Sequence, residues 1–163
     1  MMEHTMSNKF SQLQNLLVTK NWQEADRETR RVMLMIAGAD KRDNLLLTQQ
    51  DIEKFSCNDL IIIDRLWLQY SQKRFGFGVI NNIYQQVQGN YVELAKIVGW
   101  RIGDRWLNYD NIIFDISAPA GHLPVSWLVP TTFGMYWQAR FARVGWELLL
   151  SRFHSCCQIS TNR

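Results

Sequence analysis

Apolar residues recur every three to four positions along most of the chain, which is the spacing of amphipathic helices. This pattern predicts a first helix over residues 10–20 and a second over about 22–37, whose charged residues gather on the opposite side. Asn21 breaks the pattern between them. Because so short a connection joins them, we expect the two helices to form an antiparallel hairpin.

Capping residues mark the next helices. Thr48, followed three residues later by Asp51, predicts a capping arrangement at the start of a short helix that ends at Phe55. Asn58 or Asp59 is expected to cap the following helix, which continues to about residue 71. The later part of the chain predicts two short helices and a long one at 82–87, 91–98 and about 132–156.

The one segment with strand character is residues 100–106, whose alternation and central Gly-Asp predict a small hairpin. The fold class that follows is all-α: a single compact multi-helix domain, with one tiny hairpin near 100–107. We place this domain at residues 10–158, between a flexible N-terminus at 1–9 and a tail at 159–163.

Two irregular segments carry large apolar side chains. In residues 75–79, two glycines between bulky residues let the backbone turn while the rings stay together, which favours an apolar wall on a bend. The prolines at 119, 124 and 130 forbid regular structure, so residues 121–128 must form an extended loop. Its large side chains either fill the core or contact a ligand. Because they lack an obvious core position, we expect a mobile flap that a ligand orders.

Composition narrows the function classes. The 163 residues, 47% of them hydrophobic and 20% charged, are typical of one ordinary globular domain. Seven Trp, eight Phe and five Tyr can simply fill a core. The net charge of +3 is dispersed, which argues against nucleic acid as a partner, and no apolar run approaches a membrane span. No import signal is visible at the N-terminus, so a bacterial or plastid-encoded product is expected.

The three cysteines, Cys57, Cys156 and Cys157, are too few for a secreted disulfide framework. We therefore expect reduced thiols that serve packing, in a cytosol-like compartment. His154 lies close to two of them, but adjacent residues on a helix point in different directions, so no metal site is predicted.

The long last helix holds the most suggestive polar pattern. Tyr136, Arg140, Arg143 and Glu147 are spaced four, three and four residues apart, which places them on one stripe. Two guanidiniums one turn apart can hold two carboxylates of a flat apolar molecule. The alternative is that Arg143 pairs with Glu147 and that both arginines only solvate the helix.

No motif for hydrolysis, group transfer or covalent haem attachment is present, so no catalytic residue is assigned. Asp59 and Asp64 are better explained by helix capping and by pairing with Arg65 or Arg101 than as a catalytic pair. His122 could bind the metal of a metalloporphyrin, but a turn histidine that bonds the backbone is the preferred interpretation.

Several ordered motifs resemble the Genomes-Uncoupled-Four family. They are Asn21-Trp22-Gln23-Glu24-Ala25-Asp26 with Thr29, the block from Phe55 through Asp59-Leu60, Ile63-Asp64-Arg65-Leu66-Trp67 and Arg74-Phe75-Gly76-Phe77, then Val98-Gly99-Trp100-Arg101, Ser117-Ala118-Pro119 with Gly121-His122-Leu123-Pro124, and Leu150-Ser151-Arg152 with Cys156. Such a series at matching spacing, covering residues 10–157, is far more specific than any one motif.

The resemblance implies a helical fold like a cupped hand, whose concave face binds protoporphyrin IX and magnesium protoporphyrin IX. It also implies no catalysis. Members stimulate magnesium chelatase together with its large porphyrin-binding subunit, in the cyanobacterial cytoplasm or the plastid stroma, and some bind linear bilins. By position, Arg140 and Arg143 resemble the arginines that bind propionates. The porphyrin-binding set that follows is Phe75, Phe77, Val79, Leu123, Trp127, Leu128, Tyr136, Trp137, Arg140 and Arg143.

The chain departs from the family pattern at Gly78, where many members have a small polar residue, and at the bulky Trp137. These departures keep two alternatives open: a diverged member that binds a bilin, and an interaction module that has lost porphyrin binding. A haem- or bilin-modifying enzyme would need a proton donor or metal ligand, for which His122, Tyr136 and Asp115 are the candidates. Peripheral association with a membrane also stays open.

Overall fold

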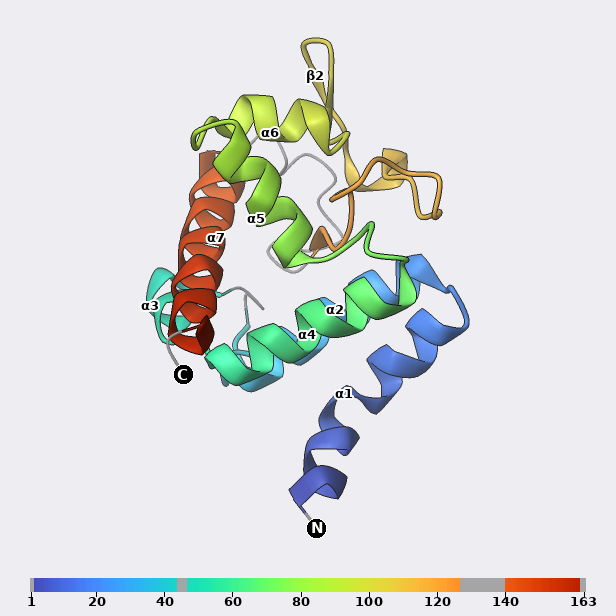
Figure 1. Cartoon of the computed structure of the whole chain (residues 1–163), viewed down its shortest axis with the longest axis vertical. Helices are drawn as coiled ribbons and strands as arrows, with labels where there is room; N and C mark the ends of the chain where they lie inside the picture. The colour runs from blue at the N-terminus through green and yellow to red at the C-terminus, as the bar shows by residue number, and fades with distance from the viewer. Residues whose placement is uncertain (1, 44–46, 127–139, 162–163) are drawn as a thin grey trace.

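The computed structural model describes residues 2–43, 47–126 and 140–161, and the regular elements within them are mostly helices (Figure 1). The elements are α1 (Met2–Val18), α2 (Trp22–Ile36), α3 (Gln49–Glu53), α4 (Cys57–Tyr70), α5 (Phe77–Gln86), α6 (Tyr91–Ile97), β1 (Arg101–Ile102), β2 (Arg105–Trp106), the 3-10 turn η1 (Tyr109–Asn111) and α7 (Arg140–Thr161). The all-α prediction is confirmed.

The first two helices form the predicted hairpin. α1 packs against both α2 and α4, and it begins at Met2 rather than at Phe10. Lys9, at the point where the pattern predicted unstructured chain, pairs with Asp59 of α4 at 3.1 Å. An ion pair between helices gives this part of α1 a tertiary contact that the apolar spacing did not reveal.

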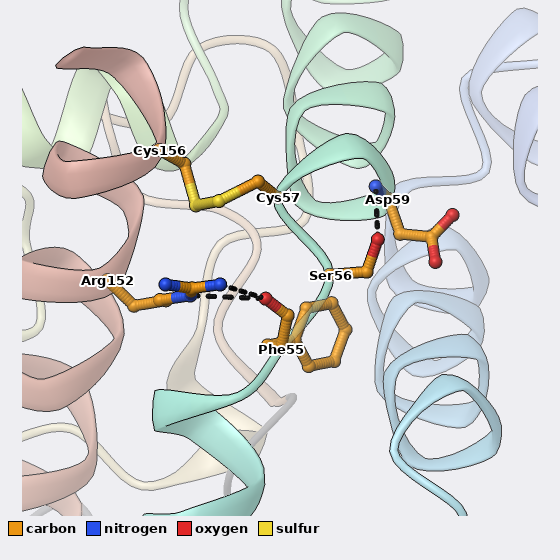
Figure 2. The surroundings of a disulfide bond; sticks show 6 residues. All are labelled: Phe55, Ser56, Cys57, Asp59, Arg152 and Cys156. Atoms are coloured by element: carbon orange, nitrogen blue, oxygen red, sulfur yellow. Dashed lines mark hydrogen bonds between the residues drawn. A yellow bond between two sulfur atoms is a disulfide. The ribbon is translucent and has the colours of Figure 1, made fainter. Parts of the chain in front are cut away.

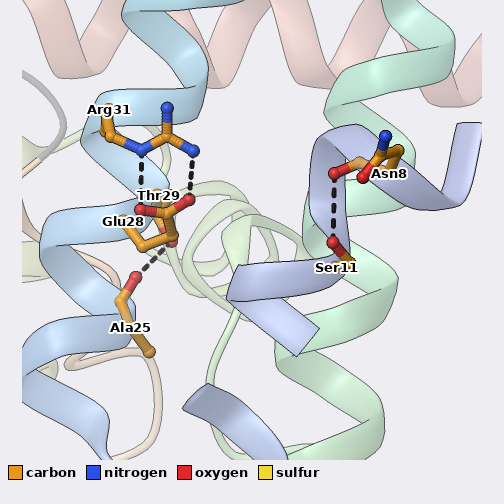
Figure 3. A network of polar contacts seen from close by, with 6 residues as sticks. All are labelled: Asn8, Ser11, Ala25, Glu28, Thr29 and Arg31. Carbon is orange, nitrogen blue, oxygen red and sulfur yellow. Dashed lines mark hydrogen bonds and ion pairs between the residues drawn. The ribbon is translucent and has the colours of Figure 1, made fainter. Parts of the chain in front are cut away.

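Side chains of α2 form polar contacts both within this helix and to α4. In Figure 3 the Thr29 hydroxyl donates to the Ala25 carbonyl one turn earlier, while Glu28 and Arg31 pair along the same helix. The same Thr29 oxygen accepts a hydrogen bond from the indole of Trp67 at 2.9 Å. Because both groups are buried, this bond satisfies the Trp67 N–H and holds α4 to α2.

The predicted capping of α3 is confirmed, and that of α4 is not. Thr48 and Asp51 form a complete capping box at the start of α3. The cap of α4 is Ser56, whose hydroxyl accepts from the Asp59 amide at 3.2 Å, and not Asn58 or Asp59. The Ser56 hydroxyl oxygen accepts a hydrogen bond as an Asn58 or Asp59 side chain would. The apolar spacing alone does not show which of these residues is the cap.

The predicted hairpin is confirmed at β1 and β2, where Arg101 pairs with Trp106 and Ile102 with Arg105. It follows α6, which begins at Tyr91 as expected, after an Asn90 cap. The start of the last helix predicted at 132 lies outside the described residues. From Arg140 onward, α7 packs against α3, α4 and α5, and forms one side of the molecule in Figure 1.

A disulfide joins Cys57 at the start of α4 to Cys156 in the C-terminal half of α7 (Figure 2). The expectation of reduced packing thiols is therefore wrong for this pair. The two residues are 99 positions apart, so only the fold brings them together. Beside them Arg152 donates two hydrogen bonds to the Phe55 carbonyl, at 3.1 and 2.9 Å, which ties the same two segments. Cys157 keeps its thiol, and burial raises its pKa.

Candidate functional site

The two glycines of the 75–79 segment make room for a buried carboxylate. Asp64 of α4 points into the start of α5, where its Oδ1 accepts from the Gly78 amide at 2.8 Å. A Cβ on Gly76 would lie 2.7 Å from Asp64 Oδ1, and one on Gly78 would lie 3.1 Å from Oδ2. Gly76 also has φ +135°, where side chains are strained. The bend is thus the first turn of α5, five residues earlier than predicted, with Asp64 at its N-terminus.

Burial raises the pKa of the Asp64 carboxyl to about 6, although the Gly78 amide and the nearby Arg65 charge both act to lower it. Asp64 therefore does cap a helix, as predicted, but the helix that it caps is α5 and not α4, to which it belongs. Asp59 sits in the first turn of α4 and pairs with Lys9. The two carboxylates therefore bind different partners, the Gly78 amide and the Lys9 ammonium.

The rings of the predicted apolar wall face the core. Phe75 and Phe77 have no exposed surface. Phe75 meets Trp22 and Trp67 edge to face, at ring-centroid distances of 5.5 and 6.4 Å. Phe77 packs on Trp146 and Phe153 of α7, each at 6.4 Å. Of the three side chains proposed on this bend, Val79 alone is partly exposed.

The described part of the 121–128 loop is anchored, which corrects the expectation that it lacks hydrogen bonds and core positions. Leu123 is fully buried, and its carbonyl accepts from the Gly76 amide at 3.1 Å. The Gly121 amide donates to the Arg74 carbonyl at 2.8 Å. These two bonds join residues 121–126 to the 74–78 bend.

Asp26 of α2 holds the other end of this segment. Its carboxylate is completely buried and accepts hydrogen bonds from the amides of Val125 and Ser126 and from the Tyr109 hydroxyl, the last at 3.0 Å. The Ser126 hydroxyl returns a bond to the Asp26 carbonyl at 3.0 Å. Burial raises the pKa of this carboxyl, while each of its donors opposes the change. Sequence analysis placed Asp26 in a family motif but missed this structural role.

His122 bonds the backbone through both ring nitrogens. The Ile113 amide donates to Nε2 at 3.0 Å, so Nδ1 must carry the proton and donate to the Val98 carbonyl, 2.7 Å away. The ring is fully buried, and burial lowers its pKa. With both nitrogens engaged, His122 has no lone pair left for an axial metal bond. The preferred interpretation was a backbone-bonded histidine, and its partners prove to be distant segments and not its own turn.

The arginine stripe is only partly described. Arg143 is largely exposed, and its Nε donates to Glu147 one turn later at 3.1 Å. This is the pairing that the alternative interpretation predicted. Arg140 begins α7 as described, three residues before Arg143. Trp127, Leu128, Tyr136 and Trp137 lie outside the described residues.

Two tyrosines that sequence analysis did not single out lie near this ion pair. The charges of Glu147 and Arg143 both act on the hydroxyls of Tyr84, in α5, and Tyr91, at the start of α6, and burial raises the pKa of both phenols. Tyr91 is 2% exposed, and its ring stacks on Trp106 at 5.7 Å. We call these four residues, Tyr84, Tyr91, Arg143 and Glu147, the tyrosine end.

Two surface grooves lie elsewhere. One of about 530 Å³ runs beside the hairpin and includes the exposed Ile102 and Ile113 with the cationic Lys96 and Arg101. The other, of about 440 Å³, is lined by Lys9 in the middle of α1, by the end of α2, by α3 and by the start of α4. Within residues 2–43, 47–126 and 140–161, no three His, Cys, Asp or Glu side chains gather as metal ligands would. A search of those same residues found no helix long and apolar enough to span a membrane.

The profile of the GUN4-like family matches residues 3–138. The chain belongs to the GUN4-like family. This confirms the relationship that the ordered motifs indicated.

Relatives and solved structures agree. The tetrapyrrole-binding protein, chloroplastic, of Arabidopsis thaliana is 33% identical over 129 residues, which are 72% of this chain and 48% of that protein. The uncharacterized protein ycf53 of Porphyra purpurea is 33% identical over 117 residues, 71% of this chain and 49% of that protein. The chain thus spans about half the length of the curated relatives it matches. The ligand-free structure of Arabidopsis thaliana GUN4 matches with a TM-score of 0.70 and 26% identity, covering 89% of this chain and 94% of that one.

The family profile covers only one part of the candidate site. The GUN4-like profile includes the 75–79 bend and the 121–126 loop but ends before Arg140 and Arg143. The bend and the loop are therefore features of the matched family segment, whereas the arginines rest on their helical spacing and on the terminal motif. The two parts of the candidate site need separate tests.

Proposed function

We propose that this GUN4-like chain binds a tetrapyrrole and performs no chemistry on it. The observation that carries this proposal is membership of the family, together with 33% identity to a relative whose name states tetrapyrrole binding. The described groups that an enzyme could use are engaged otherwise. His122 bonds two backbone groups, and the exposed Asp115 accepts from the Ser117 amide.

The proposed ligand is a dicarboxylic porphyrin, protoporphyrin IX or magnesium protoporphyrin IX. Arg140 and Arg143 would bind its propionates, because a guanidinium forms two parallel hydrogen bonds to a carboxylate. The structure changes how the apolar residues contribute. Val79, Trp127, Leu128, Tyr136 and Trp137 remain candidates for direct contact with the macrocycle, whereas Phe75, Phe77 and Leu123, buried in the core, would support the concave face from behind.

Binding requires a change at Arg143. In the free protein its charge is balanced by Glu147, so a propionate has to compete with that carboxylate. An exposed ion pair one turn apart is typically worth only about 0.3 to 0.5 kcal/mol, which is less than a charge-assisted bond to a held carboxylate. The competition therefore favours the ligand.

The proposed partner is the large porphyrin-binding subunit of magnesium chelatase, which the chain would stimulate by presenting porphyrin to it. This role is carried by the family resemblance alone. The compartment proposed is the cytoplasm of a cyanobacterium or the stroma of a plastid, in line with relatives from a cyanobacterium and from a chloroplast.

One rival is favoured by particular observations. The Arg143–Glu147 ion pair and the complete burial of Phe75 and Phe77 are also what an interaction module without a ligand would have. A bilin-binding member is a second variant of the proposal, since a linear tetrapyrrole carries the same two propionates.

A visible absorption titration separates these functions. The purified chain is titrated with protoporphyrin IX, magnesium protoporphyrin IX, biliverdin and haem. The proposal predicts saturable one-to-one binding of the two porphyrins, at about micromolar affinity or tighter, with quenching of Trp fluorescence. Preference for biliverdin would select the bilin variant, and absence of saturable binding for every ligand would select the interaction module.

A second experiment tests the arginines. The double change Arg140→Ala with Arg143→Ala should weaken binding of protoporphyrin IX by about 2 to 4 kcal/mol, because two charge-assisted contacts are lost at a partly wet rim. Arg27→Ala is the matched control, since Arg27 is similarly exposed and pairs with Glu24 on α2. Loss of the far-UV helix signal in the double variant would instead assign the arginines a structural role.

A further inference from the structure

The Tyr91 hydroxyl is buried without a hydrogen-bond partner in the part of the chain that the structure describes. Buried phenols usually find a partner, because a phenolic O–H removed from water loses hydrogen bonds that nothing else restores. Tyr109 shows the usual situation in the same protein: its buried hydroxyl donates to Asp26 at 3.0 Å. We therefore expect the free protein to be no more stable with this tyrosine than with a phenylalanine at the same position.

The rest of the side chain is well placed. Its ring stacks on Trp106 with an interplanar angle of 19°. The guanidinium of Arg101 lies over the Trp106 ring, 5.4 Å from its centroid. The ring alone would satisfy this packing. What the hydroxyl adds is a buried donor without a partner, on which the charges of Glu147 and Arg143 both act.

We propose that Tyr91 is a ligand-binding residue of the tetrapyrrole site, whose hydroxyl donates a hydrogen bond to a ligand carboxylate held by Arg143. This inference rests on the proposed function and specifies its polar contacts. When a propionate replaces Glu147 on Arg143, it brings an acceptor to the tyrosine end, where the buried Tyr91 hydroxyl lacks one. The combination of a guanidinium and a phenol on one carboxylate selects a carboxylated tetrapyrrole over an esterified one.

The proposal predicts opposite effects of one substitution on stability and on binding. Tyr91→Phe removes the unsatisfied hydroxyl and keeps the ring, so the unfolding temperature of the free protein should stay equal or rise. The dissociation constant for protoporphyrin IX should increase about tenfold, the usual consequence of losing a hydrogen bond to a charged group. For protoporphyrin IX dimethyl ester, which carries no carboxylate, the same substitution should change affinity by less than about twofold.

Tyr70→Phe is the matched control. Tyr70 lies on α4, and its hydroxyl accepts a hydrogen bond from Gln14 at 3.0 Å, away from the tyrosine end. Its affinities for the free acid and for the ester should equal those of the wild type. Thermal unfolding and absorption titration of the wild type and both variants therefore complete the experiment.

Three results would overturn the inference while leaving the proposed function intact: unchanged affinity of Tyr91→Phe for protoporphyrin IX, an equal loss of affinity for acid and ester, or an unfolding temperature lowered by several degrees. The second would indicate a packing role, and the third would mean that the hydroxyl has a partner in the free protein. If the wild type binds neither the acid nor the ester, and also none of the other tetrapyrroles of the titration above, the proposed function fails, and this inference fails with it.

Discussion

The anchored loop, residues 121–126, and the tyrosine end both contain buried polar groups, but they differ in whether those groups are satisfied. In the anchored loop, the Asp26 carboxylate collects three donors and His122 uses both ring nitrogens. At the tyrosine end, the Tyr91 hydroxyl has no partner among the described residues, and the charge of Arg143 is balanced by the partly exposed Glu147.

This difference separates structural from functional candidates. A buried polar network with every member satisfied rigidifies a fold, whereas an unsatisfied buried group needs another explanation. The residues that looked like a mobile flap belong to the first kind. Tyr91, which the sequence marked only as the start of a helix, belongs to the second.

The largest expected effect is that of Asp26→Ala. The substitution leaves the amides of Val125 and Ser126 and the hydroxyl of Tyr109 without their acceptor, and each unsatisfied buried donor costs about 1 to 3 kcal/mol. Because some of these donors can relax toward water, we expect unfolding by urea to report a loss of about 4 kcal/mol. Asp115→Ala, which removes one exposed hydrogen bond to the Ser117 amide, is the control and should lower stability by less than about 1 kcal/mol. A loss no greater than that of the control would mean that the loop is not anchored.

Reduction of the Cys57–Cys156 disulfide comes next. The bond closes a long loop between α4 and the C-terminal half of α7, so the pair of changes Cys57→Ser and Cys156→Ser should lower the free energy of unfolding by about 3 kcal/mol. Affinity for protoporphyrin IX should remain, because the tyrosine end lies near the other end of α7. Cys157→Ser is the matched control. Equal stability of the oxidised and reduced chains would show that the bond contributes nothing to the fold.

Asp64 gives a smaller, pH-dependent effect. Burial raises the pKa of its carboxyl from 3.8 to about 6, so the folded state binds a proton more tightly than the unfolded state does. This contribution to stability is fully present below pH 3.8 and is lost as the pH rises through about 6. Asp64→Asn cannot ionise but keeps an oxygen for the Gly78 amide.

As the pH rises from about 4 to about 7, the wild type should therefore lose about 2 kcal/mol of unfolding free energy relative to Asp64→Asn. Urea unfolding at several pH values measures the difference, with Asp110→Asn as an exposed control. A difference that is constant with pH would contradict the raised pKa.

Local patterns predicted the helices well because each depends on nearby residues. Apolar spacing gave α2 and α6, and Thr48 with Asp51 gave the cap of α3, since a capping box is complete within four residues. The same local logic missed the early start of α5. Its first turn depends on Asp64, a carboxylate of the preceding helix, which no spacing within 75–82 indicates.

The candidate site was harder to predict because its residues owe their roles to distant partners. Phe75 was expected to line a ligand face, but Trp22 and Trp67 from two other helices enclose it. Leu123 was expected on a flap, but Gly76 and Asp26 fix the loop that carries it. Tyr91 was treated only as the start of a helix, and nothing in its sequence neighbourhood shows that its hydroxyl is unsatisfied.

Amide hydrogen exchange with and without protoporphyrin IX tests the contrast between the two regions most directly. In the free protein, the amides of residues 74–78 and 121–126 should already be protected, because most of them donate to buried acceptors, and ligand should leave their exchange unchanged. Exchange should slow on binding in α6 and in the turn at residues 87–90 that precedes it. Rapid exchange of residues 121–126 in the free protein, slowed by ligand while α6 stays unaffected, would contradict the account.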